Sequence, residues 1–234
     1  RILPPFFNYK HRIVWSKTEH INDLDEIEHP VVREALKWMK IDYGMEIHHN
    51  GDLPARSGLG SSSSFSVGIL HMLHALRGEL CSREKLAREA IYLEQTLLQE
   101  AVGVQDQITA AFGGLNKIEI APDGNFNVQP LPLSKERLRD LESRILMFYT
   151  GTSRYASNIA KEKIAEIPKK TSELHEIRKM VDIATELLCN GSNLDDFGRL
   201  LNETWQLKRA LSTSVAPSFV DDIYSRARQA GALG

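Results

Sequence analysis

Residues 54–64 have the composition of a loop that binds phosphate. They read Pro-Ala-Arg-Ser-Gly-Leu-Gly-Ser-Ser-Ser-Ser and run into an apolar helical pattern that begins near Phe65. Gly58 and Gly60 permit backbone angles and close approaches that a Cβ would prevent. The first N–H groups of the following helix have no intrahelical acceptor and lie at its positive end, where they would face an anion. The alternative is a capped helix start without a ligand, because serine is also a favoured N-cap.

This loop is not of the Walker type, because no lysine follows Gly60 to reach the outer phosphates. We therefore expect the phosphates of a nucleotide to be held by backbone N–H groups, by Arg56 and by serine hydroxyls, with Mg²⁺ neutralising the remaining charge. The residues predicted to bind the nucleotide, which the family resemblance described below implies is ATP, are Pro54, Arg56, Ser57, Gly58, Leu59, Gly60, Ser61, Ser62 and Ser63.

Two acids follow on expected helices. Glu94 falls on an apolar stripe with Ile91 and Leu98, where a carboxylate is costly to bury unless it is paired, hydrogen-bonded or bound to a cation. An ion pair within the protein or a half-buried stripe is the structural alternative. Asp106 comes shortly after Gly103 and near a helix start, so it either stabilises the helix dipole or accepts a proton from a substrate hydroxyl during phosphoryl transfer.

The string Pro54-x-x-x-Gly58-Leu59-Gly60-Ser61-Ser62 closely resembles the second conserved motif of the GHMP kinases, the superfamily of galactokinase, homoserine kinase and mevalonate kinase. Galactokinase-like members have a Mg²⁺-binding Glu followed by a catalytic Asp in a Gly-x-x-Asp-Gln string. Glu94 and Asp106 occur in this order and at the separation expected from galactokinase. The resemblance implies that Asp106 is catalytic and that Ser62 and Glu94 bind Mg²⁺.

A further stretch, residues 150–156, resembles the Thr-Gly-x-x-Arg segment that many members place beside the acceptor substrate. The resemblance implies substrate contacts from Thr152 and Arg154, and from Gly103 and Gln105 beside the catalytic acid. A helix start capped by Thr152 is the alternative reading of this stretch.

Within the superfamily, the chain looks most like the kinases of D-glycero-D-manno-heptose 7-phosphate, on the basis of residues 3–14, 57–65 and 152–154. That resemblance implies ATP-dependent phosphorylation of the anomeric hydroxyl, with a small sugar phosphate and ATP as the binding partners. The alternatives are another sugar 1-kinase, acting on galactose, fucose or an N-acetylhexosamine, and a non-catalytic sugar or nucleotide sensor on the same fold. A homodimer is one possible assembly.

The family resemblance also implies a two-domain α+β fold. We expect a GHMP kinase N-terminal, ATP-binding βα domain at residues 1–141 and a ferredoxin-like C-terminal domain at residues 142–234. The chain begins without Met and stops within an expected turn, so we expect it to be truncated at both ends and to lack the first and third family motifs.

The composition is ordinary for a globular protein. The 234 residues are 42% hydrophobic and 26% charged. The formal net charge of −2 does not indicate the excess of positive charge that binding to nucleic acid or to an anionic membrane requires. No apolar run reaches the roughly 20 residues of a membrane span. The two cysteines show neither a disulfide framework nor metal spacing, and we expect a cytoplasmic protein. His71 and His74 are close on one expected helix, but without a visible carboxylate or third ligand they do not predict a metal site.

Periodicity and turn residues give the expected elements. We predict strands at residues 12–15, 45–48, 115–120 and 126–131, and a buried strand at 145–149. The predicted helices cover residues 30–40, 62–76, 82–99, 105–112, 134–141, 174–188, 195–211 and 218–230.

Overall fold

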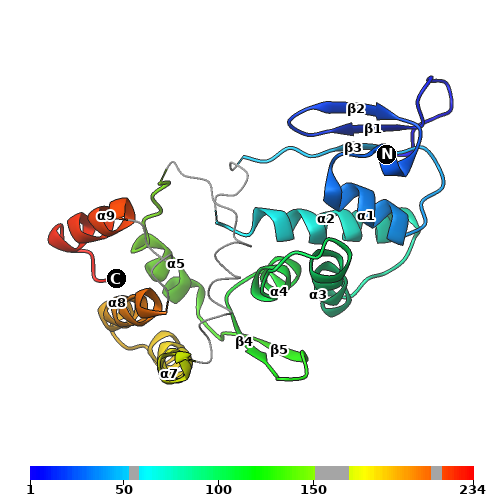
Figure 1. Ribbon diagram of the computed structural model, residues 1–234. Coiled ribbons are helices and arrows are strands. Elements are labelled where there is room, and N and C mark those ends of the chain that lie inside the picture. Colours follow the sequence, from blue (N-terminus) through cyan, green and yellow to red (C-terminus); the bar gives the residue numbers. More distant parts are fainter. Residues whose placement is uncertain (53–57, 151–168, 212–217) are drawn as a thin grey trace. The chain divides into compact units, whose positions relative to one another are not determined.

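The computed structural model describes residues 1–52, 58–150, 169–211 and 218–234 (Figure 1). Two compact units make up the chain, Arg1–Gly113 and Gly114–Gly234. In the described residues, no helix combines the length and the apolar character that a membrane crossing requires.

The N-terminal unit contains a small mixed sheet with the strand order β2-β1-β3 (Figure 1). Strand β1 (His11–Val14) pairs antiparallel with β2 (Thr18–Ile21) and parallel with β3 (Glu46–His48). In the parallel pair Ile13 lies opposite Ile47, and both side chains are buried. Because β1 and β3 run in the same direction, the segment that leaves β3 departs from the carboxyl end of both strands.

The other described elements of this unit are helices. After the short 3-10 helix η1 (Leu24–Glu26), the helices are α1 (Pro30–Trp38), α2 (Ser61–Leu76), α3 (Arg83–Tyr92) and α4 (Gln105–Phe112), and a π-helical turn, η2 (Leu93–Leu97), directly continues α3. Helix α1 begins at Pro30. Backbone N–H groups in the first turn of a helix have no acceptor within the helix, and proline has no N–H to leave without one. The start of α3 follows from Ser82, whose side chain accepts a hydrogen bond from the Lys85 N–H.

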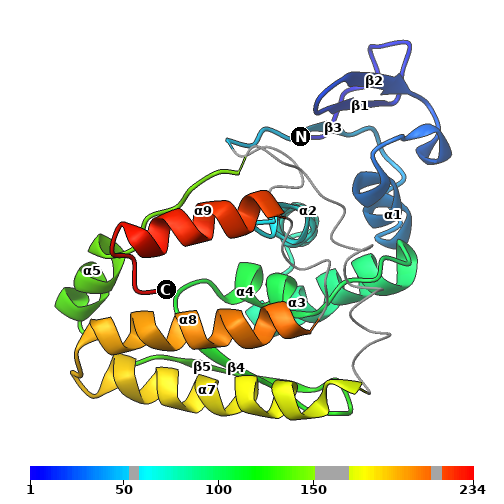
Figure 2. The ribbon, with the colours of Figure 1, turned by 60° about the vertical axis from the view of Figure 1, so that its left-hand side comes forward.

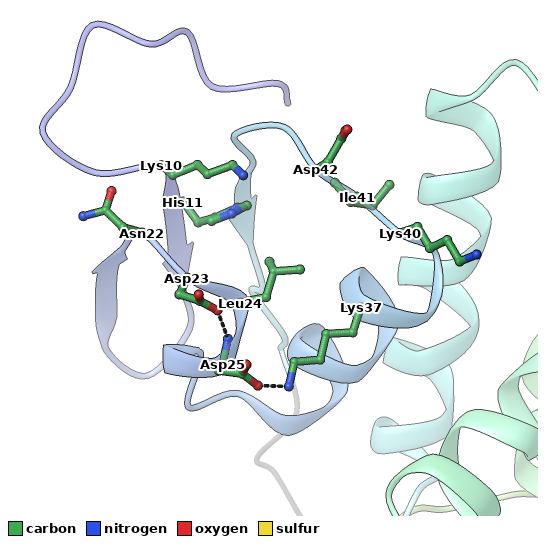
Figure 3. Close-up of a pocket in the computed structure, with 10 residues that line it drawn as sticks. All are labelled: Lys10, His11, Asn22, Asp23, Leu24, Asp25, Lys37, Lys40, Ile41 and Asp42. Atoms are coloured by element: carbon green, nitrogen blue, oxygen red, sulfur yellow. Dashed lines mark hydrogen bonds and ion pairs between the residues drawn. The ribbon is translucent and has the colours of Figure 1, made fainter.

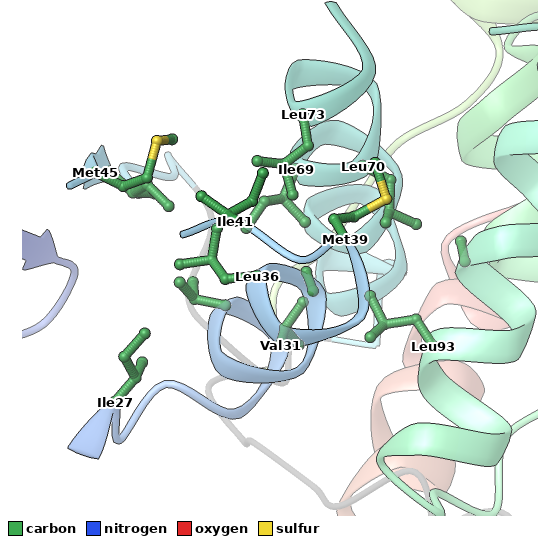
Figure 4. Packing of buried hydrophobic residues seen from close by; sticks show 14 of the residues in the cluster. Ile27, Val31, Leu36, Met39, Ile41, Met45, Ile69, Leu70, Leu73 and Leu93 are labelled. Atoms are coloured by element: carbon green, nitrogen blue, oxygen red, sulfur yellow. The ribbon is translucent and has the colours of Figure 1, made fainter. Parts of the chain in front are cut away.

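The core of this unit lies between the sheet, α1 and α2 (Figure 4). Leu36 of α1 and Leu70 and Leu73 of α2 are fully buried, as is Leu93 of η2. Burying each such leucine contributes roughly 1.5–3 kcal/mol relative to leaving it exposed. This packing holds the first turn of α2, which carries the serine-rich segment, in a fixed position relative to η2 and α4.

The C-terminal unit contains one hairpin and four described helices. The hairpin pairs β4 (Asn116–Ile120) with β5 (Phe126–Pro130), and the described helices are α5 (Lys135–Ser143), α7 (Thr171–Cys189), α8 (Leu194–Ala210) and α9 (Ser218–Gln229). Helices α7 and α8 lie side by side (Figure 2). A small core joins them to α5 through Leu141, Leu188 and Leu194.

The two compact units divide at Gly113, whereas the domain boundary was predicted after residue 141. The reason is that the hairpin and α5 contact the C-terminal helices. Arg137 of α5 donates hydrogen bonds to the carbonyl oxygens of Leu187, Leu188 and Ser192 at 2.6–3.2 Å. Lys117 of β4 lies 2.8 Å from Asp182 of α7. The boundary between the two family domains after residue 141 stays a prediction.

Two predicted elements need correction. The predicted strand at residues 145–149 is not a strand, and its side chains are exposed, Leu146 by 79%. An apolar run indicates a tendency to be buried, but a strand also needs a neighbouring strand to pair with. No described residues pair with the segment 145–149. The predicted helix at 82–99 is regular only to Tyr92, where the π-helical turn begins. The other predicted elements that fall on described residues are present within a few residues of their expected bounds.

We expect Arg137→Ala to lower the unfolding free energy of the C-terminal unit by about 1–3 kcal/mol, because three carbonyl groups lose a charged donor. Arg139→Ala on the same helix is the matched control, since Arg139 is exposed and has no hydrogen-bond or ion-pair partner among the described residues. Urea unfolding followed by circular dichroism measures both variants. Equal losses in the two variants would contradict the role of Arg137.

Candidate active site

The serine-rich segment opens helix α2 with free backbone donors. Gly60 is the N-cap residue in the left-handed region, with φ 69°, and it provides no capping side chain. The first intrahelical hydrogen bond runs from the Ser64 N–H to the Gly60 carbonyl oxygen at 2.9 Å. The N–H groups of residues 61–63 therefore have no acceptor within the helix, and no acid lies in the first turn to compete with an anion.

Asp106 lies directly against this helix start. It is on the first turn of α4, and a Cβ placed on Gly60 would be 3.4 Å from the Oδ2 and Cγ atoms of Asp106. The missing side chain at residue 60 thus lets a carboxylate sit beside the loop. Among the described residues, Asp106 has no hydrogen-bond or ion-pair partner, and its side chain is exposed.

Glu94 is positioned by the π-helical turn that follows α3. The Leu98 N–H donates to the Leu93 carbonyl oxygen at 2.9 Å, five residues back rather than four. Such turns inside helices are frequent at functional sites, because the extra residue redirects the side chains beside it. Leu93 and Glu94 are both buried, and Glu94 is only 1% exposed.

The Glu94 carboxylate is hydrogen-bonded on one oxygen only. The Ser63 hydroxyl donates to Oε2 at 3.0 Å, and the Gln107 side-chain amide donates to the same oxygen. Oε1 is buried without a partner, and no described cation pairs with this carboxylate. A buried acceptor without a partner costs about 1–3 kcal/mol, and more when it is charged. A divalent cation would remove that cost, so the residues present fit a Mg²⁺ ion.

Helix α4 brings the two acids to the same end of α2. Asp106 and Gln107 are consecutive, so their side chains leave the helix about 100° apart, as follows from 3.6 residues per turn. Gln107 contacts Glu94 while Asp106 faces Gly60. The loop, the buried carboxylate and the exposed carboxylate therefore form one arrangement within the N-terminal unit.

The structure places most of the predicted site residues. Gly58, Leu59, Gly60 and Ser61 form the loop and helix start, and Gly103 and Gln105 are exposed near the start of α4. Ser62 is exposed on the first turn of α2, and it is its neighbour Ser63 that contacts Glu94. The remaining predicted residues, Pro54, Arg56, Ser57, Thr152 and Arg154, lie outside the described residues.

Three contacts at Glu94 were not predicted. Ser63 is buried together with Ser66 and Val67, which lie one helical turn further on, but the run of four serines does not by itself distinguish Ser63 from Ser62. Gln107 is also buried, and no sequence signal marks it beyond its place beside Asp106. The Glu100 N–H donates to the Glu94 carbonyl oxygen at 2.9 Å, and burial together with the negative charge of Glu94 raises the pKa of Glu100.

A separate cavity of about 410 Å³ lies at the other end of β1 (Figure 3). Lys10 and His11, at the start of that strand, line it, whereas the serine-rich segment follows the carboxyl end of the neighbouring parallel strand. Its charged lining is balanced between Lys10, Lys37, Lys40, Asp23, Asp25 and Asp42. It therefore does not have the excess of positive charge that a triphosphate would require.

The comparisons with known proteins identify the fold and the domain. Residues 30–114, which contain the loop and both acids, match the family described as GHMP kinases N terminal domain. The N-terminal unit therefore carries a GHMP kinase N-terminal domain, as its resemblance to this family predicted. A D-glycero-alpha-D-manno-heptose 7-phosphate kinase from Campylobacter jejuni is 29% identical over 205 residues, which cover 86% of this chain and 59% of that protein.

Two further matches extend this result. A bifunctional fucokinase/GDP-fucose pyrophosphorylase from Arabidopsis thaliana is 28% identical over 77% of this chain and 18% of that protein. The crystal structure of a D-glycero-D-manno-heptose 1-phosphate kinase from Bacteroides thetaiotaomicron aligns with a TM-score of 0.71 at 22% identity, over 86% of this chain and 64% of that one. The predicted α+β fold of the GHMP kinases is thus confirmed. The chain spans less than two thirds of the length of these relatives.

Proposed function

We propose that this protein is an ATP-dependent sugar kinase that phosphorylates the anomeric hydroxyl of D-glycero-D-manno-heptose 7-phosphate. One observation carries the proposal: Glu94 and Asp106, from different helices, both lie at the donor-rich start of α2, and one oxygen of Glu94 is buried without a partner. The matching family and the heptose phosphate kinases among the relatives support it.

In this proposal the triphosphate of ATP lies along Gly58–Ser63. Backbone N–H groups at the start of α2 would donate to phosphate oxygens, with the positive end of the helix dipole behind them. Glu94 and a hydroxyl of the first turn, Ser62, would hold Mg²⁺, which when bound neutralises phosphate charge. Ser63 and Gln107 would orient Glu94, because both donate to its Oε2 atom.

Asp106 would act on the acceptor sugar. Its exposed carboxylate can accept a hydrogen bond from the anomeric hydroxyl and take its proton as the hydroxyl oxygen attacks the γ-phosphorus. The bond from the γ-phosphorus to the bridging oxygen breaks, and ADP leaves. Most of the rate acceleration would come from positioning and from charge neutralisation, since phosphoryl transfer asks little covalent chemistry of the protein.

Gly60→Ala tests the geometry of the loop. A Cβ at φ 69° is strained by roughly 1–2 kcal/mol, and it would contact the Asp106 carboxylate. We expect the KM for ATP to rise about 5- to 30-fold, the ratio that a strain of this size produces when the loop relaxes out of its ATP-binding conformation. Gly68→Ala, within the same helix and with open space at its Cβ position, is the control and should keep the wild-type KM. Similar kinetics in both variants would count against the proposed loop.

The sugar is tested by coupled assays of ADP formation with the full-length protein. D-glycero-D-manno-heptose 7-phosphate should be turned over, and galactose, fucose and N-acetylhexosamines should not. Robust turnover of an unphosphorylated sugar would exclude the heptose assignment while keeping a sugar 1-kinase, an alternative to which the fucokinase match lends support. ATP binding without phosphate transfer to any sugar would instead indicate a non-catalytic sensor.

A further inference from the structure

A second cluster of possible ligands lies where α2 turns into α3, at the opposite end of α2 from Gly60. His74 is in the last turn of α2, Glu79 and Cys81 are in the connection, and Glu89 is on α3. We call these four residues the His74 cluster. The carboxylate partners of His74 could not be predicted from the sequence, because they are five and fifteen residues away and meet it only after the helices pack.

His74 is held between two carboxylates. Its Nδ1 atom is 2.7 Å from Oε2 of Glu79, and its Nε2 atom is 2.6 Å from Oε2 of Glu89. The His74 side chain is 3% exposed and that of Glu89 15%, so this contact is largely shielded from water. Lys85 lies 3.7 Å from the other Glu89 oxygen, Oε1, which leaves Oε2 directed at the ring.

Cys81 completes a set of three different ligand atoms. The Sγ atom of Cys81, a ring nitrogen of His74 and a carboxylate oxygen of Glu89 all lie within 4.8 Å of one another. In a tetrahedral zinc site with metal–ligand distances of 2.0–2.3 Å, such atoms are roughly 3.3–3.7 Å apart. Small side-chain rotations would therefore bring the three atoms to the required separations.

We infer that the His74 cluster binds Zn²⁺ through His74 Nε2, Cys81 Sγ and Glu89 Oε2. Nδ1–H of His74 would stay hydrogen-bonded to Glu79, the outer carboxylate that usually orients a metal-binding histidine. A thiolate and a carboxylate balance the charge of the ion, and the proton displaced from the thiol, with any proton displaced from Nε2, goes to solvent. With three protein ligands, the fourth position would be taken by water.

The competing explanation is an ion network without a metal. A doubly protonated His74 can donate to both glutamates, and this accounts for the two short contacts. It gives no role to Cys81. The two explanations therefore differ in whether a metal ion bonds to the sulfur.

Cobalt(II) is the spectroscopic probe, because it occupies zinc sites and absorbs in the near ultraviolet when a thiolate binds it. We expect the wild-type full-length protein to show this charge-transfer absorption on titration with CoCl₂, at one equivalent and in excess Mg²⁺, which prefers oxygen ligands. Zn²⁺ should abolish the absorption by displacement. Cys81→Ser should remove it, whereas the matched variants Cys189→Ser and His71→Gln should keep it. Glu79→Gln should weaken cobalt binding by about 10–100-fold.

A second measurement does not depend on the folding of any variant. Alkylation of the wild-type protein with iodoacetamide, read by peptide mass spectrometry, should be slowed at Cys81 by at least about tenfold when ZnCl₂ is present, and unchanged at Cys189. The proposal is overturned if cobalt gives no thiolate band with the wild-type protein, if the band persists in Cys81→Ser, or if zinc leaves the alkylation of Cys81 unchanged. None of these readouts depends on kinase activity.

Discussion

Asp106→Asn is expected to lower the turnover number by at least about 100-fold, because the amide keeps the shape of the side chain but cannot accept a proton. ATP binding should change little, since the amide can occupy the same place beside Gly60. Turnover is measured by coupled ADP formation, and ATP affinity by calorimetric titration of the same preparations.

The exposed Asp222 of α9 supplies a matched control, and Asp222→Asn should retain wild-type turnover. A parallel fall in turnover and ATP affinity for Asp106→Asn would show that the residue shapes the nucleotide site rather than the acceptor. Near-normal turnover would remove the proton-accepting role altogether.

Glu94→Gln is expected to raise the Mg²⁺ concentration needed for half-maximal activity by at least about tenfold. The substitution removes the negative charge but keeps an oxygen that can accept from Ser63 and Gln107, so the fold should be preserved. We expect an increase of this size in the required Mg²⁺ concentration because the divalent ion loses one charged ligand in a buried position. The measurement is a titration of activity against Mg²⁺ at fixed ATP, together with the melting temperature.

Glu84→Gln provides the comparison, because Glu84 is an exposed acid on α3 that pairs with Arg88. Glu94→Asp, which keeps the charge on a shorter side chain, should restore part of the metal affinity. An unchanged Mg²⁺ titration for Glu94→Gln, with the fold intact, would exclude Glu94 as a ligand.

The parts of the site that could be predicted from the sequence are those with local causes. Gly60 and the serines mark the start of α2, and the Gly113–Gly114 pair marks the end of α4, so both helices were placed within about a residue. The family resemblance then selected Glu94 and Asp106 among the acids of the chain. Their convergence at the start of α2 is a structural observation, whereas their catalytic roles remain proposals.

The parts that could not be predicted depend on contacts between distant segments. Predicting which of Ser62 and Ser63 contacts Glu94 requires knowing how α2 is rotated about its axis. That rotation is set by the packing of α2 against α4 and η2. The π-helical turn at Leu93–Leu97 has no local breaker such as Gly or Pro within it. The segment 145–149 has the composition of a buried strand, but strand formation also needs a partner, and composition cannot specify one.

The most direct test of the site is the position of a bound metal and nucleotide. Crystals of the full-length protein grown with MnCl₂ and a non-hydrolysable ATP analogue would locate manganese by anomalous scattering. We predict one manganese peak bonded to the Glu94 carboxylate, with the triphosphate along Gly58–Ser63 and its terminal phosphate facing Asp106. A nucleotide bound elsewhere, or a metal out of reach of Glu94, would contradict the proposed site.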